Sequence, residues 1–121
     1  MISREAIEGL FEHTRQLRAE GRVKWDVDEI CRWSYFFVDS SRDRLLDAGA
    51  VLVGLGYESH GLLDEPAPDN DGQETLYLRV DRLEQHSVES LVARSRELSA
   101  VADRLGLRAF DGMDVGAVDG P

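Results

Sequence analysis

Cysteine, proline and long apolar runs are all scarce in this sequence. Its 121 residues include one cysteine and three prolines. A single cysteine excludes an internal disulfide and a zinc site built from cysteines, so we expect Cys31 to be a buried thiol. Segment 1–20 alternates charged side chains with single apolar ones and never builds the continuous apolar run of a signal peptide or a membrane span. We therefore expect a cytoplasmic protein that does not bind membranes.

Basic residues are few compared with acidic ones. The chain has 14 Lys and Arg against 24 Asp and Glu, for a net charge of −10. This charge opposes nucleic-acid binding, which depends on cations that contact phosphates. Between Arg44 and Arg79 no basic residue occurs, while that interval contains Asp47, Glu58, Asp64, Glu65, Asp69, Asp71 and Glu74. We expect one strongly negative part of the surface and a basic protein partner.

Motifs typical of enzymes are also missing. The sequence has no G-x-S-x-G elbow, no Walker loop and no G-x-G-x-x-G turn. Its three histidines, His13, His60 and His86, fall on different predicted elements without a second His or Cys at metal-binding spacing. We expect surface histidines, no catalytic residues and no cofactor, with a general base assembled only by the fold as the alternative.

Asp69 and Asp71 lie two residues apart, just before Gly72. Many calcium-binding loops begin with this pattern. Aligning Gly72 with the glycine of an EF-hand loop places Ala67 and Leu78 at the first and last ligand positions, where neither can bind calcium. The flanking segments also have the pattern of strands. We therefore interpret this segment as an exposed hairpin turn and not as a metal site.

The apolar pattern predicts three helices and four strands in one domain. The helices are expected over 3–20, 41–55 and 87–106, and the strands over 30–39, 57–63, 74–83 and 107–110. After the first helix the order is β-α-β-β-α-β, which is typical of an α+β, ferredoxin-like fold with a four-stranded antiparallel sheet and two helices on one face. We place the domain at 1–115 and a fraying tail at 116–121.

Aromatic residues are concentrated in the first predicted strand. Trp33, Tyr35 and Phe37 share one face of it, and Tyr77 belongs to a strand that this topology places next to it. Phe36 and Val38 make the opposite face apolar too. Base stacking on such a face is disfavoured because the basic-aromatic signature of RNA recognition motifs does not accompany these residues. We expect core packing or a protein contact, with the first helix, a partner or a second copy covering the second face.

The order and spacing of these elements resemble the RraB family, the regulators of ribonuclease activity B. The likeness covers about residues 5–113 and includes LGYE at 55–58 and FDG at 110–112. The resemblance implies a ferredoxin-like, acidic protein that binds the regulatory region of ribonuclease E and inhibits RNA processing without chemistry of its own. After Gly112 the chain has Met113 where the family tends to have a tryptophan, and it lacks a long acidic tail.

The predicted partner-binding residues combine the acidic connection with two tyrosines: Asp64, Glu65, Asp69, Asp71, Glu74, Tyr35 and Tyr77. The expected partner is a ribonuclease with a basic, arginine-rich segment, which the carboxylates attract electrostatically. The protein itself is expected to be a monomer or a homodimer. Two alternatives stay open: an immunity protein that neutralises a basic toxin, and a regulatory domain that binds a small ligand.

Overall fold

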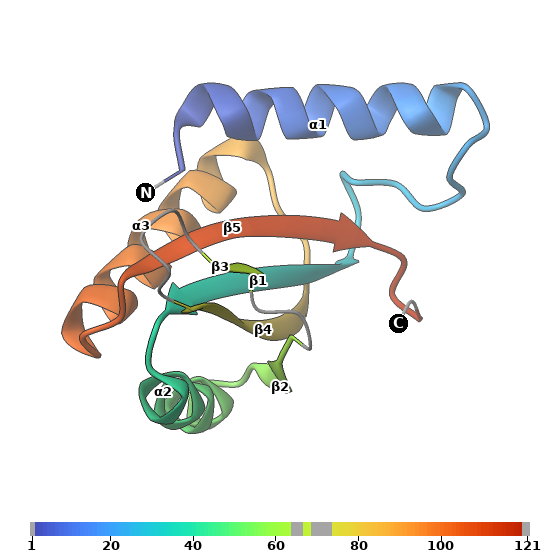
Figure 1. The fold of residues 1–121 in the computed structure, drawn as a ribbon. Helices are drawn as coiled ribbons and strands as arrows, with labels where there is room; N and C mark the ends of the chain where they lie inside the picture. Colours follow the sequence, from blue (N-terminus) through green and yellow to red (C-terminus); the bar gives the residue numbers. More distant parts are fainter. Residues whose placement is uncertain (1, 64–66, 69–73, 120–121) are drawn as a thin grey trace.

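The fold is a four-stranded antiparallel sheet with three helices (Figure 1). The computed structural model describes residues 2–63, 67–68 and 74–119. The elements are α1 (Arg4–Ala19), β1 (Cys31–Asp39), α2 (Arg42–Gly54), β2 (Glu58–Leu62), β3 (Ala67–Pro68), β4 (Glu74–Glu84), α3 (Val88–Arg104) and β5 (Ala109–Gly116). The sheet order is β2-β4-β1-β5, and the two-residue β3 pairs with β4. The predicted α+β fold with an additional N-terminal helix is confirmed.

Each helix is capped by the serine at which its predicted range begins. The side chains of Ser3, Ser41 and Ser87 accept hydrogen bonds from backbone N–H groups in the first turns of α1, α2 and α3. Such caps satisfy donors that the helix itself leaves unpaired. Past the helix ends, Gly21, Gly56 and Gly106 have φ angles of 73°, 101° and 72°, a conformation that side chains with a Cβ rarely adopt.

The core lies between the sheet and the helices. Trp33, Tyr35 and Phe37 of β1 are fully buried on the helix-covered face, as are Leu78 and Val80 of β4. These strands are neighbours, with Tyr35 opposite Val80 and Phe37 opposite Leu78. The helices contribute Ile7, Phe11, Leu45, Leu52, Leu91 and Leu98. The aromatic side of β1 is therefore the core side of the sheet.

Helix α1 joins this helical layer, and the prediction that it covers the second sheet face is wrong. Phe11 is fully buried, and its ring lies 6.0 Å from that of Trp33 on the core side. In Figure 1 α1 runs along the β5 side of the molecule, while α2 lies on the β2 side. The other face of the sheet mixes the polar Arg32, Ser34 and Arg79 with the aromatic Phe36 and Tyr77.

Strand β5 is longer than predicted. The sequence indicated a strand over 107–110 followed by a fraying tail, but β5 pairs with β1 as far as Gly116. The register shifts between Phe36 and Phe37, so that Phe110, Met113 and Val115 stand opposite the core side of β1. With strict alternation of side chains between the two faces of a strand, Phe110 and Met113, three residues apart, would lie on opposite faces. The domain limit at residue 115 stays a prediction, although Arg32 Nε also donates to the Val118 carbonyl at 3.2 Å.

Candidate partner-binding surface and polar clusters

Most of the predicted docking carboxylates lie outside the described residues. This holds for Asp64, Glu65, Asp69 and Asp71. Glu74 begins β4, where its backbone pairs with Pro68 of β3. The strands on either side of this connection, β2 and β4, are hydrogen-bonded antiparallel neighbours. The role of these five carboxylates stays a prediction.

The two predicted tyrosines lie on opposite faces of the sheet. Tyr35 is fully buried on the helix-covered side, where its ring packs against those of Tyr57 and Phe110. A partner cannot reach it, so we correct its assignment to the interface. Tyr77 is half-buried, pairs with Val38 and belongs to the face without helices. Because both aromatic faces of β1 looked apolar in the sequence, the sequence could not show which one was the core.

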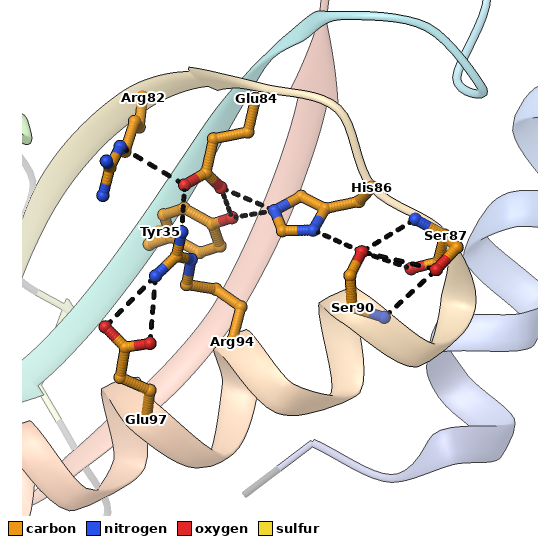
Figure 2. Close-up of polar contacts among 8 residues, drawn as sticks. All are labelled: Tyr35, Arg82, Glu84, His86, Ser87, Ser90, Arg94 and Glu97. Atoms are coloured by element: carbon orange, nitrogen blue, oxygen red, sulfur yellow. Dashed lines mark hydrogen bonds and ion pairs between the residues drawn. The ribbon is translucent and has the colours of Figure 1, made fainter.

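A buried carboxylate, Glu84, organises a polar cluster between the end of β4 and α3 (Figure 2). Its Oε2 accepts hydrogen bonds from the Tyr35 hydroxyl at 2.7 Å and from His86 Nε2 at 2.5 Å. Its Oε1 accepts from Arg94 Nη2 at 2.5 Å and lies 3.4 Å from Arg82 Nε. The Glu84 side chain is 8% exposed. We call these five residues the Glu84 cluster.

The partners of Glu84 decide its ionisation. Burial disfavours the charged carboxylate, but hydrogen bonds from His86 and Tyr35 and the charge of Arg94 outweigh burial and lower the pKa of Glu84 to about 2. Burial, together with the nearby Glu84 carboxylate, raises the pKa of Tyr35. Glu84 is therefore an anion and Tyr35 a neutral hydrogen-bond donor at neutral pH.

The Glu84 cluster continues into the start of α3. His86 Nδ1 lies 2.9 Å from the Ser90 hydroxyl, which also accepts a hydrogen bond from the Ser87 backbone N–H at 2.8 Å. Ser87 in turn caps the helix. Arg94 makes a second ion pair, with Glu97, at 3.0 Å. These contacts hold α3 against β4, and the charged side chains of the Glu84 cluster pair with one another or with Glu97.

The prediction of surface histidines is wrong for His86, whose side chain is 6% exposed. His86 packs edge-on against Trp33, with ring centroids 5.3 Å apart. His13 is exposed, whereas the side chain of His60 is 31% exposed. Nothing in the local sequence marks His86 as buried, because its partners Tyr35 and Glu84 belong to two strands that only the fold brings together.

A second charged cluster surrounds Asp81 on the sheet face without helices. Asp81 is fully buried and accepts two hydrogen bonds of 2.9 Å from Arg79. Arg32 Nη1 and His60 Nε2 approach its Oδ2 to 3.3 and 3.1 Å. Burial opposes ionisation, yet hydrogen bonds from Arg79 and Ser34 and the charge of Arg79 lower the pKa of Asp81. This cluster connects strands β1, β2 and β4.

A cavity of about 280 Å³ opens on the same face between β1 and β5. Its lining includes Arg32, Ser34, Phe36, Arg79 and Asp114. Pockets for small ligands are usually larger and mostly apolar. This cavity is therefore smaller and more charged than most small-ligand pockets.

Other sequence predictions concern the thiol, metals and membranes. Cys31 is buried, as predicted; its thiol donates to the Asp26 carbonyl at 3.1 Å, and burial raises its pKa. Within residues 2–63, 67–68 and 74–119, no group of three or more His, Cys, Asp or Glu side chains is arranged to hold a metal ion. No helix in that part of the chain is long and apolar enough to cross a membrane.

Comparison with known families identifies the chain. A family model described as regulator of ribonuclease activity B matches residues 12–115. The chain belongs to this family. A search of curated proteins finds no match. The matched region includes both charged clusters and extends from the middle of α1 to the end of β5, so the family assignment concerns the whole sheet and its helical layer.

Membership of the RraB family bears on what the site does. The family consists of regulators of ribonuclease activity, which suggests a role exerted on another protein. Apart from Arg82, whose side chain is 38% exposed, the charged groups of the Glu84 cluster are largely buried and stabilise contacts between elements of the chain. A surface that contacts a ribonuclease is therefore better sought among the exposed residues of the molecule.

Proposed function

We propose that the protein binds a ribonuclease E-like enzyme in the cytoplasm and lowers its activity without chemistry of its own. A basic, arginine-rich segment of the ribonuclease docks on the acidic connection between β2 and β4. Asp64, Glu65, Asp69, Asp71 and Glu74 supply the attraction. The family match supports a ribonuclease as the partner. The single observation that supports this location is the charge distribution: residues 45–78 contain seven carboxylates and no Lys or Arg.

The proposed attraction acts mainly on the rate of encounter. Exposed charges steer a partner of opposite sign at long range, and salt screens them over about 10 Å at 0.1 M ionic strength. Apolar contacts, by contrast, determine how long a complex lasts. Loss of the carboxylates should therefore slow association and weaken its salt dependence, with a smaller effect on dissociation.

The test is the association rate with purified ribonuclease E as a function of ionic strength. The variant replaces Asp64, Asp69 and Asp71 by Asn and Glu65 and Glu74 by Gln. The matched control also removes five carboxylates: Glu5, Glu8 and Glu12 of α1, its C-cap Glu20, and Glu29 in the following loop are each replaced by Gln. We expect slower association and a flatter salt slope only for the first variant. Equal rates and slopes in both variants and the unchanged protein would remove the connection from the interface.

A further inference from the structure

The sheet has one face on which none of the three helices packs, and we call it the open sheet face. Helices α1, α2 and α3 all contribute to the core on the other side (Figure 1). Apolar side chains of the open sheet face include Phe36 on β1 and Tyr77 and Leu83 on β4. Phe36 and Tyr77 are half-buried, and Leu83 is 48% exposed. Another protein surface can therefore contact these three side chains.

The charges on the open sheet face nearly cancel. Its described strands present two arginines, three carboxylates and one histidine: Arg32, Arg79, Glu58, Asp81, Asp114 and His60. Arg32 Nη1 pairs with Glu58 at 3.1 Å and with Asp81 at 3.3 Å, and Arg79 pairs with Asp81 at 2.9 Å. The whole chain has a net charge of −10. Most of that charge therefore lies elsewhere on the molecule.

This balance of charges limits which partner fits the open sheet face. A nucleic acid needs a surplus of cations, and a strongly basic segment needs a surplus of carboxylates. A partner surface that mixes both signs with aromatic residues suits this face better, and a second copy of the chain supplies one. Aromatic residues and arginine are enriched at protein interfaces, while lysine is depleted. The open sheet face has this composition, with Phe36, Tyr77 and two arginines on its central strands.

The open sheet face also has the area that a small dimer interface needs. Strands β1, β2, β4 and β5 comprise nine, five, eleven and eight residues. At about 3.3 Å per residue and about 4.8 Å between strands, they form a flat area of about 500 Å². Two such faces would bury about 1,000 Å², which is the lower limit for a specific interface. This area suits a weak, reversible dimer.

We propose that the open sheet face is the contact surface between two copies of this chain. The two sheets pack face to face, at about 30° to each other and about 10 Å apart, around a two-fold axis. Phe36, Tyr77 and Leu83 supply the apolar contacts, and side chains of the second copy fill the cavity of about 280 Å³ between β1 and β5. The proposal does not depend on the proposed function, because this chain alone forms the dimer.

Salt should strengthen this dimer. Two copies with a net charge of −10 each repel one another at long range, and salt screens this repulsion. The ion pairs of Arg32 and Arg79 lie within each copy, so attraction between the copies does not depend on them. We expect the Kd of the dimer to fall by about threefold or more between about 0.05 M and about 0.5 M NaCl. The proposed ribonuclease complex should respond to salt in the opposite direction.

Leu83→Glu tests the open sheet face, and Leu46→Glu is its matched control. The two leucines are 48% and 44% exposed, but Leu46 belongs to α2 on the other side of the sheet. Both variants add the same net charge, whereas only Leu83→Glu brings two like charges into the interface. Sedimentation equilibrium of the full chain measures Kd. We expect Leu83→Glu to raise Kd by about tenfold or more and Leu46→Glu by less than about twofold.

Three results would overturn the proposal. The first is an unchanged protein that stays monomeric at about 200 μM in about 0.5 M NaCl, a measurement that needs no variant. The second is a dimer that both variants weaken equally. The third is a monomeric protein whose binding to purified ribonuclease E is lost in Leu83→Glu alone, which would assign the face to that partner. If the dimer behaves as expected while ribonuclease E does not bind, the proposed function fails and the dimer surface stands.

Discussion

Glu84 at the end of β4 and Arg94 on α3 form an ion pair with 2.5 Å between Oε1 and Nη2, and their side chains are 8% and 19% exposed. The same arginine pairs with the exposed Glu97 on its own helix. One cation thus holds one buried and one exposed carboxylate. Comparing variants of the two carboxylates therefore shows how burial changes the contribution of an ion pair to stability.

Removing the buried carboxylate should destabilise the protein far more than removing the exposed one. Glu84→Gln removes the buried carboxylate that Arg94 and His86 share and leaves Arg94 with the exposed Glu97 alone. We expect the free energy of unfolding to fall by about 2 to 4 kcal/mol. Glu97→Gln should cost less than about 1 kcal/mol, because its side chain is 55% exposed. Urea denaturation of both variants measures this, and equal losses would contradict the structural role of the Glu84 cluster.

The low pKa of Glu84 makes its contribution pH-dependent. The pKa falls from 4.5 to about 2 on folding, so this stabilisation is complete above pH 4.5 and is lost as the pH falls toward 2. The difference in unfolding free energy between the unchanged protein and Glu84→Gln should therefore shrink between about pH 6 and about pH 3. A difference that stays constant over this range would mean that Glu84 titrates normally in the folded protein.

Ser87 at the start of α3 should contribute more to the stability of the protein than Ser99 farther along the helix. The Ser87 side chain accepts a hydrogen bond from the Ser90 N–H at 3.2 Å, and its replacement by Ala should cost about 1 kcal/mol. The Ser99 hydroxyl has no hydrogen-bond partner among the described residues, so Ser99→Ala should be neutral or slightly stabilising. Thermal melts compare the two, and a larger loss for Ser99→Ala would reverse this account.

Calcium should not stabilise the fold. The sequence pattern around Asp69 and Asp71 lacks the first and last ligands of a calcium loop. We therefore expect the same melting temperature with chelator and with millimolar calcium at constant ionic strength. A substantial rise with calcium would show preferential binding to the folded state and contradict the interpretation as a turn.

Local patterns sufficed for much of the fold. The serine caps of α1, α2 and α3 and the alternation around Leu78 and Val80 predicted these elements to within a few residues. The strand β5 was shortened in the prediction, because the register shift between Phe36 and Phe37 spoils the alternation that pairing requires. A shift of this kind depends on the neighbouring strand and is not visible in one strand alone.

The candidate sites were less accessible to sequence analysis. The Glu84 cluster joins Tyr35, Glu84 and Arg94 from three separate elements, so no local spacing announces it. Within α2 the exposed and the buried apolar residues looked alike in the sequence, and only the exposure of Leu46 and Val53 distinguishes them from Leu45 and Leu52. The charge of the β2–β4 connection, in contrast, could be read from the sequence directly.

The central claim is that this protein regulates a ribonuclease by binding it. The most direct measurement is the rate at which purified ribonuclease E cleaves a fluorescently labelled RNA while increasing amounts of the protein are added. We predict that the rate falls to a plateau as the complex saturates, and that the protein alone leaves the RNA intact. A cleavage rate that does not change at saturating protein, or RNA cleavage by the protein itself, would contradict the account.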